Sequence, residues 1–240
     1  MKKPKILKKL FVLFIKILLI FVALSLFIVL LFRFIPVPYS MFMVQRKVSS
    51  IVEGKDYKIK SKWVSIDHMS PYLPLAVICA EDQLFEEHHG FDFGAITKAL
   101  RRNAKPRVKR VHGASTITQQ MVKNLYLWPS RTYIRKGAEA YLTVLVELLW
   151  PKKRIIEVYL NIIELGEGVF GVEAASKKYF GRSSSTVSLN DAALLAAVLP
   201  NPIRYKVAAP SPYVLRRRGW ITRQCFLSGG LEKVNFIREK

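Results

Sequence analysis

Acidic side chains are scarce in this chain, which carries 17 of them against 39 lysines and arginines. Glu81 and Asp82 end an apolar segment, and Glu139 stands four residues after Arg135 in a second, longer one. Carboxylates in such places can act as general acids or bases. Each also has an ordinary interpretation: a solvated helix end for Glu81 and Asp82, and an i,i+4 ion pair worth about 0.5 kcal/mol for Glu139.

Basic side chains lie near these acids in the sequence. Lys123, Arg131 and Arg135 belong to two neighbouring segments with helical spacing, and Lys152 begins a third. A helix start flanked by lysine or arginine is suited to binding an anion. Any one of these cations could equally belong to a solvated basic face. Together with two carboxylates, they indicate a phosphorylated substrate handled by general acid–base chemistry.

Other templates for chemistry are weak. Residues 166–171 match GxGxxG, but the segment before them has helical spacing, which predicts a glycine turn between helices rather than a dinucleotide site. The four histidines form neither an HExxH motif nor zinc-spaced pairs with cysteine. Ser115 lacks the GxSxG elbow of a serine hydrolase, and capping a helix is the favoured role for it.

Helices are predicted to position nearly all of these residues. Thr116 and Gln119 fit a capping box at a helix start. Residues 131–150 follow the 3.6-residue period of the longest helix after the N-terminal segment, and Pro151 suits the first turn of the next. With no run of alternating strands and no repeat, the domain is predicted to be mainly α. Further helices are expected over about 70–82, 92–100, 172–180 and 190–199, with a last one from Ser211.

The first forty residues carry a membrane signal. Five lysines within residues 1–9 precede an apolar run over 17–32, which residues 10–15 extend behind Lys16. About 20 apolar residues cross the hydrocarbon core, whereas the apolar part of a signal peptide has only about 7–15. Residues 34–38 also offer no small-x-small cleavage site. The lysines place the N-terminus in the cytoplasm, so the remaining domain is expected outside it.

The net charge of +22 is not confined to the anchor, because basic runs recur at 105–110, 152–154 and 216–218. Such a surface favours anionic partners such as phosphate or acidic lipid headgroups. Nucleic acid is not expected as a ligand outside the cytoplasm. The two cysteines, Cys79 and Cys225, permit one disulfide in that compartment without requiring it, and Cys79 also suits a buried apolar position.

Four spaced motifs carry a resemblance to a known family. They are EDQLFEEHHGFD over 81–92, GASTITQQ over 113–120, RK with a glutamate over 135–139, and KKRIIEVYLN over 152–161. In this order they resemble the peptidoglycan glycosyltransferases, glycosyltransferase family 51, whose lysozyme-like domain polymerises lipid II. The resemblance covers roughly residues 65–210. Because the chain ends at Lys240, with no room for a penicillin-binding domain, it predicts the monofunctional type.

The resemblance implies roles for the residues it covers. Glu81 is expected to be the general base that deprotonates the acceptor's sugar 4-hydroxyl, and Glu139 to assist departure or position groups. The growing glycan strand would be transferred to lipid II with inversion and release of undecaprenyl pyrophosphate. The residues expected to bind pyrophosphate or lipid II are Lys123, Arg131, Arg135, Lys152, Ser115, Thr116, Gln119, Gln120 and Asn124. Those expected to support the site are Asp82, Phe85, His89 and Gly90.

The implied organisation is a mainly α, lysozyme-like glycosyltransferase domain behind one transmembrane helix. Its expected parts are a cytoplasmic stretch over 1–9, an anchor over 10–35, a partly extended connector over 36–64 and the domain over 65–240. The location would be the bacterial inner membrane, with the domain extracytoplasmic. Partners would be lipid II, the lipid-linked strand, the membrane and cell-wall synthesis or division proteins. Mg or Mn could assist, as in some relatives, although no ligand set for a metal is legible.

Two rival functions stay open on the sequence. A lysozyme-like lytic muramidase would share the acid but would not need a cation cluster for pyrophosphate. A non-catalytic basic protein that binds acidic lipid or organises partners would need the charge but neither glutamate.

Overall fold

An N-terminal helix forms a unit of its own, Met1–Pro36, separate from a second unit over Val37–Lys240. The computed structural model describes residues 3–104, 113–130 and 132–237. Helix α1 (Lys3–Phe34) is continuous, and its part over Lys8–Phe34 is, within those ranges, the one helix long and apolar enough to cross a membrane. It coincides with the apolar span that the sequence predicts.

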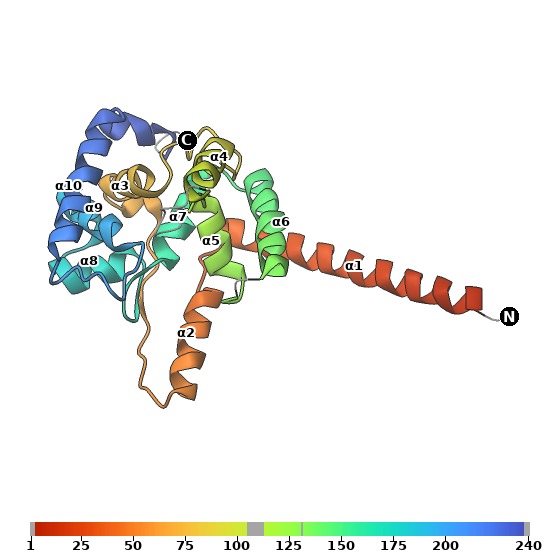
Figure 1. Cartoon of the computed structure of the whole chain (residues 1–240). Coiled ribbons are helices and arrows are strands. Elements are labelled where there is room, and N and C mark those ends of the chain that lie inside the picture. Colours follow the sequence, from red (N-terminus) through yellow and green to blue (C-terminus); the bar gives the residue numbers. More distant parts are fainter. Residues whose placement is uncertain (1–2, 105–112, 131, 238–240) are drawn as a thin grey trace. The chain divides into compact units, whose positions relative to one another are not determined.

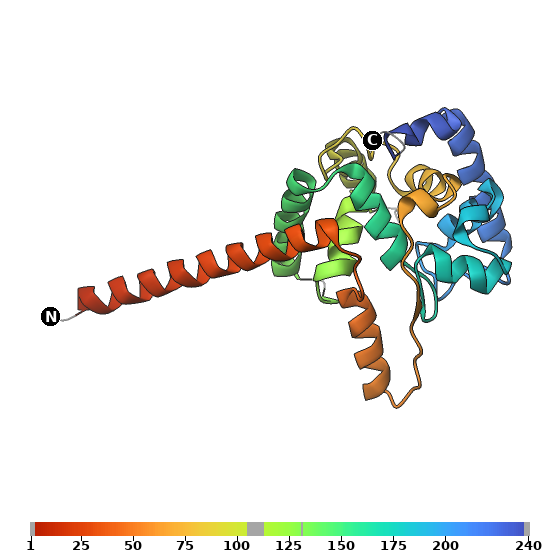
Figure 2. The same cartoon turned by 180° about the vertical axis from the view of Figure 1, so that it is seen from behind.

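The second unit is mainly helical, as the sequence predicts (Figure 1). Both views show α3, α8, α9 and α10 gathered on one side of this unit and α5 with α6 on the other (Figures 1 and 2). Helix α7 packs against both α3 and α5, so it joins the two sides. The larger helices are α2 (Met41–Val52), α3 (Tyr72–Glu81), α4 (Phe93–Asn103), α5 (Ile117–Tyr126), α6 (Tyr133–Leu149), α7 (Lys152–Ile162), α8 (Val172–Phe180), α9 (Leu189–Val198) and α10 (Pro212–Leu227).

Two short helices form the centre of the first side. Every residue from Leu73 to Cys79 in α3 is buried, and so is every residue from Ala192 to Val198 in α9. A helix that is apolar all round has to be covered on all sides, and α10 packs on both of them. The end of α3 is therefore held in a close-packed setting. A capping box of Ser188 and Asp191 starts α9.

Helix α7 is buried from Ile155 to Ile162, including two polar side chains. Asn161 accepts a hydrogen bond from the backbone N–H of Val64 at 2.9 Å and donates to the same residue's carbonyl at 2.9 Å. Glu157 accepts from the backbone N–H of Ile66 at 3.1 Å. These bonds give partners to the backbone polar groups of Val64 and Ile66, which lie in the irregular segment between β1 and α3.

The predicted glycine turn over 166–171 does lie between two helices, α7 and α8. The short strands around it were not predicted: β2 (Glu164–Gly166) and β3 (Val169–Phe170) pair antiparallel, and β1 (Lys60–Ser61) pairs parallel to β3. Gly168 has a φ of 69°, and a Cβ there would lie 2.5 Å from the carbonyl oxygen of Lys58. The glycines thus serve a tight hairpin and the close approach of a third chain segment.

The segment expected to be a partly extended connector contains α2. Ser40 caps it by accepting a hydrogen bond from the N–H of Met43 at 3.2 Å, and α2 packs on α5. A single turn of 3-10 helix, η1 (Ile66–His68), precedes α3. Two further 3-10 segments are η2 (Ser184–Thr186) and η3 (Gly230–Ile237).

Candidate active site

Glu81 is the last residue of α3, where the buried helix opens into a cleft. Its side chain is 15% exposed. One carboxylate oxygen accepts a hydrogen bond from Gln120 Nε2 at 3.1 Å, and the other lies 3.0 Å from Arg217 Nη2. Gln120 is on α5 and Arg217 on α10, so three helices meet at this carboxylate.

Burial raises the pKa of Glu81 above its ordinary value. The hydrogen bond from Gln120 and the charge of Arg217 oppose that rise, while the neighbouring Asp82 adds to it. A raised pKa strengthens a carboxylate as a base once it is ionised. Glu81 is therefore a stronger base, when ionised, than an ordinary exposed glutamate.

A hydrogen bond from Tyr159 fixes the orientation of the Gln120 side-chain amide. Tyr159, a fully buried residue of α7, donates its hydroxyl hydrogen to Gln120 Oε1 at 3.0 Å. That bond leaves the NH₂ group of Gln120 facing Glu81, where it donates. Burial raises the pKa of Tyr159 well above its ordinary value, so the phenol stays protonated and keeps donating.

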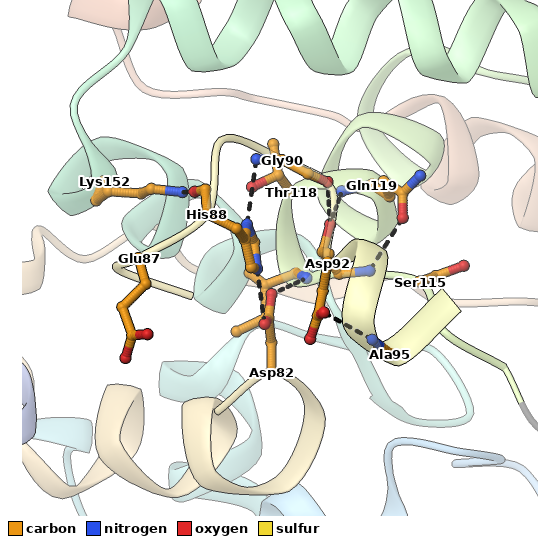
Figure 3. A network of polar contacts seen from close by, with 12 residues as sticks. Asp82, Glu87, His88, Gly90, Asp92, Ala95, Ser115, Thr118, Gln119 and Lys152 are labelled. Atoms are coloured by element: carbon orange, nitrogen blue, oxygen red, sulfur yellow. Dashed lines mark hydrogen bonds and ion pairs between the residues drawn. The ribbon is translucent and has the colours of Figure 1, made fainter. Parts of the chain in front are cut away.

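Asp82 follows Glu81 in the chain and organises the loop after α3 (Figure 3). It is buried, and its oxygens bond His88 Nε2 at 2.8 Å and the backbone N–H of Ile117 at 2.9 Å. The other ring nitrogen, His88 Nδ1, accepts from the N–H of Gly90 at 3.2 Å. His88 therefore carries its proton on Nε2, and Asp82 ties α3 to the start of α5.

Gly90 is required at the turn of this loop. Its φ is 85°, and a Cβ would lie 2.6 Å from Cγ2 of Thr143 on α6. Its carbonyl accepts from the hydroxyl of Thr116 at 2.7 Å. Thr116 and Gln119 form the predicted capping box, in which the backbone N–H of each residue donates to the side-chain oxygen of the other, at 3.1 and 3.2 Å.

A second group of charged side chains consists of Lys123 on α5 and Arg135, Lys136 and Glu139 on α6. Glu139 is buried in the interior of α6, with 3% of its side chain exposed. Arg135 Nη1 donates to one of its oxygens at 2.5 Å, and Lys136 pairs with the other. The ordinary interpretation of Glu139 as an i,i+4 ion pair is thus confirmed as a contact. Arg135 also donates from Nε to the carbonyl of Ser130 at 2.5 Å.

Lys123 faces the other members of this group. It is exposed to solvent and lines the cleft together with Asn124. Partial desolvation in the cleft lowers the pKa of Lys123, the positive charges of Arg135 and Lys136 lower it further, and Glu139 and Glu81 oppose the change. An ammonium held among other cations gains from a bound anion, because the anion removes their mutual repulsion.

Three neighbouring cavities, which together form the cleft, extend from Glu81 to the cations. A cavity of about 500 Å³ contains Glu81, Ser115 and Arg217. It shares Gln120 and Pro200 with a second cavity of about 270 Å³. That cavity in turn shares Lys123, Asn124 and Phe42 with a third, of about 400 Å³, which Trp128 and Arg135 also line. A substrate lying along the cleft can therefore meet the carboxylate and the cations together.

Lys152 occupies a different setting from Lys123 and Arg135. Its Nζ donates to the carbonyl of His88 at 2.6 Å, pairs with Glu147 at 2.9 Å and lies 4.7 Å from the centre of the Phe85 ring (Figure 3). Phe85 is completely buried. The contacts of Lys152 therefore stabilise the loop after α3.

The remaining predicted residues divide by position. Ser115 and Asn124 line the cleft. Arg131 lies outside the described residues. His89, expected to support the site, is exposed, and its neighbour His88 takes the place beside Asp82.

Arg217 and Tyr159 are cleft residues that the sequence reasoning did not single out. Arg217 was counted within a basic run, yet it shares the helical stripe of Val214 and Ile221, which are buried on α10. That spacing was an available signal for an inward-facing arginine. Tyr159 stands among apolar neighbours with no polar pattern to mark it. Within the described ranges, no three His, Cys, Asp or Glu side chains gather as a metal would need.

The chain matches the family model described as Transglycosylase over residues 46–226. The chain belongs to the transglycosylase family. Among its relatives, the biosynthetic peptidoglycan transglycosylase of Shigella dysenteriae serotype 1 is 55% identical, covering 83% of each chain. Those of Pectobacterium atrosepticum and Citrobacter koseri are 54% and 52% identical, covering 83% and 91% of this chain and 82% and 90% of their own.

Membership makes this chain an enzyme, a glycosyltransferase, and confirms the resemblance read from the four motifs. The matched residues include both ends of the cleft, from α3 to α10. The transglycosylase thus combines, in one groove, a partly buried carboxylate and a cluster of cations.

Proposed function

We propose that this transglycosylase polymerises lipid II into glycan strands. The observation that carries the proposal is the cleft that joins Glu81, with its raised pKa, to Lys123 and the Arg135–Lys136–Glu139 group. A sugar linked to a lipid pyrophosphate presents a hydroxyl to deprotonate and a doubly charged leaving group. The two ends of the cleft match those two needs. The 54% identical relatives named for peptidoglycan also support this substrate class.

In the proposed reaction, Glu81 takes the proton from the 4-hydroxyl of the acceptor sugar. The oxygen attacks the donor's anomeric carbon from the face opposite the pyrophosphate. A new glycosidic bond forms as the bond to the pyrophosphate breaks, and that group leaves with the electron pair. The α linkage becomes β in one displacement. Gln120 and Arg217 hold the carboxylate in place, and Arg217 keeps its pKa from rising further.

The cations act on the leaving group. Lys123 and Arg135 line the same part of the cleft, and preorganised positive charge there stabilises the charge that develops on the pyrophosphate. We assign Glu139 the task of fixing Arg135 and Lys136, because both its oxygens are engaged by them. In this assignment Glu139 positions the two cations and does not itself assist the departure of the pyrophosphate.

Other residues of the motifs serve the framework in this proposal. Thr116, Gln119 and Gly90 shape the start of α5, while Asp82, Phe85 and Lys152 hold the loop after α3. Ser115 and Asn124, on the cleft walls, are placed to contact lipid II. The assignment of Lys152 differs from the direct pyrophosphate contact expected from the motif, since its ammonium already has three partners.

We further propose that α1 anchors the enzyme in the bacterial inner membrane with the N-terminus in the cytoplasm and the domain outside. Five lysines before the apolar span support that orientation. Donor and acceptor are both carried by lipids in this proposal. An anchored enzyme then meets them at the raised effective concentration of the membrane surface.

The deciding experiment incubates the purified full-length protein with labelled lipid II and, separately, with finished peptidoglycan. We expect glycan strands from the first and no soluble fragments from the second. Soluble fragments without strand growth would instead identify a lytic muramidase. Lipid binding with neither product would identify a non-catalytic binding protein.

The anchor is tested with a variant that starts at Val37. We expect it to lose more activity on lipid II in liposomes than on detergent-dispersed lipid II, because only the liposome assay depends on shared membrane residence. Equal losses on both substrates would contradict that role.

A further inference from the structure

One pair of reactive side chains is not used by the proposed reaction. Cys79 and Cys225 are the chain's two cysteines, and both are free and buried, with 1% and 0% exposed. Cys79 lies on α3 and Cys225 on α10, and these two helices pack against each other. The helices that bring Glu81 and Arg217 together therefore also bring the two cysteines to one buried interface.

Polar contacts beside the thiols hold the two backbones in register. Ser228 Oγ lies 3.4 Å from Cys79 Sγ and donates to the carbonyl of Cys225 at 3.1 Å. Gln83 donates from Nε2 to Gln224 Oε1 at 3.2 Å and to the carbonyl of Cys79 at 3.3 Å. A disulfide needs its two Cβ atoms close and correctly directed. Both cysteines contact the same Ser228 side chain across the α3–α10 interface, so small rotations of the two side chains are what the bond requires.

We propose that Cys79 and Cys225 form an intramolecular disulfide that fastens the Glu81 end of α3 to α10. The oxidant is a disulfide, either a small molecule such as oxidised glutathione or a protein oxidant. One protein thiolate attacks it, forming a mixed disulfide and releasing one thiol. The second protein thiolate then attacks the protein sulfur of that mixed disulfide and releases the other thiol. One S–S bond forms in the protein, one is reduced in the oxidant, and the two protons end on the released thiols.

The reactivity of the pair is unequal. The neighbouring Cys225 side chain lowers the pKa of Cys79 to about 7, against the effect of burial, whereas the Cys79 side chain and burial raise the pKa of Cys225. Cys79 is thus the thiolate suited to the first attack. Its burial means that the oxidant reaches it during folding or local opening, and that the finished bond is protected from reductants.

The inference rests on the proposed extracytoplasmic location for its occurrence in the cell, because disulfides persist in oxidising compartments. The chemistry of the pair can be measured apart from that location. A bond here would limit the separation of Glu81 from Arg217 without touching either side chain. It would also close a long loop, which restricts the unfolded chain more than the folded one.

The test uses purified full-length protein in detergent, incubated with oxidised glutathione a few degrees below its thermal midpoint and then denatured and treated with a maleimide. We expect the mass to fall by about 2 Da and the number of maleimide labels to fall from two to none, with both changes reversed by reductant. The C225A variant is the matched control and should end as a single glutathione adduct. Two free thiols, or two separate glutathione adducts, in the wild-type protein would overturn the proposal.

A second measurement tests the fastening. The oxidised wild-type protein should melt about 5–10 °C higher than the same protein after reduction, while C79A/C225A should melt at one temperature in both buffers. A crosslinked protein with no such shift would contradict the claim that the bond fastens the helices. Strand growth from lipid II is recorded on the same samples, so a failure of the proposed function is scored separately from a failure of the disulfide.

Discussion

Glu81 and Glu139 are the same type of residue in opposite settings. Glu81 ends a helix, is 15% exposed, and shares its oxygens with one arginine and one amide. Glu139 lies inside a helix, is 3% exposed, and has a cation on each oxygen. One carboxylate borders the cleft and has a raised pKa, and both oxygens of the other are engaged in ion pairs. Residue type alone therefore does not assign a role, but the partners of each carboxylate do.

The largest effect is expected from Glu81→Gln. A neutral amide cannot accept the acceptor's proton, so strand growth should fall by about 1000-fold, measured as initial rates with labelled lipid II. Lipid II binding should be retained. Glu87→Gln is the matched control in the following loop, with 62% of its side chain exposed, and should stay active. Near-normal turnover by Glu81→Gln would remove Glu81 from the base role.

The same variant tests the cost of burying the charge. Because burial raises the folded-state pKa of Glu81 above its unfolded value, the protonated form favours folding. That contribution is complete below the unfolded pKa and is lost as pH rises through the folded pKa. Thermal melting of Glu81→Gln at neutral pH should consequently show no loss of stability, and a clear drop would contradict this sign.

Glu139→Gln should be the next most damaging change. It removes the charge that holds Arg135 and Lys136, and we expect a loss of about 100-fold in kcat/KM with an unchanged circular dichroism spectrum. Glu167→Gln, an exposed position, is the control. If Glu139→Gln raised only the KM for donor at constant kcat, Glu139 would act on ground-state binding alone.

Lys123→Met tests the cationic end directly. Loss of one preorganised charge near the leaving group should lower kcat by about 10–100-fold. Lys123→Arg should recover part of the rate, since it keeps the charge. Lys153→Met removes a lysine that pairs with Asp67 at 2.9 Å on the surface, and it should behave as wild type. Equal rates for the Met and Arg variants would mean that the charge of Lys123 is not used.

The smallest effect at high pH is expected from Arg217→Met. The positive charge of Arg217 lowers the pKa of Glu81, so its removal should raise that pKa further. The acid limb of the pH profile of kcat/KM should move to higher pH, with a loss of about tenfold at acidic pH and less above it. Arg216→Met changes an exposed neighbour and should leave the profile in place. An unshifted limb in Arg217→Met would show that Glu81 does not feel this arginine.

Much of the fold was predictable because local signals agreed with the final packing. Thr116 and Gln119 form the predicted capping box, and the expected helix over 172–180 has those bounds in the structure. Helix α2 was missed although Ser40 caps it, because residues 48–52 at its end are all β-branched residues or serines, which have low helix propensity. The hairpin over 164–170 was missed because strands of two or three residues leave no alternating pattern.

The site was predictable only in part. The acids and cations stood out by their scarcity or clustering, and the motifs supplied their order along the chain. The pairing of Arg217 with Glu81 joins positions 136 residues apart, which no local pattern encodes. The choice of His88 over His89 beside Asp82 depends on the turn at Gly90. Long-range partners of this kind follow from packing rather than from spacing.

The length of α1 has a physical consequence for where the enzyme can work. Between Lys9 and Arg33 the helix carries no charged residue except Lys16, and this part measures about 35 Å at about 1.5 Å per residue. The hydrocarbon core of an average bilayer is about 30 Å thick, so the helix has to tilt or locally thicken the membrane. Each response costs a fraction of a kcal/mol per ångström of mismatch. Strand synthesis would then depend on bilayer thickness, and liposomes with longer acyl chains would suit this helix better.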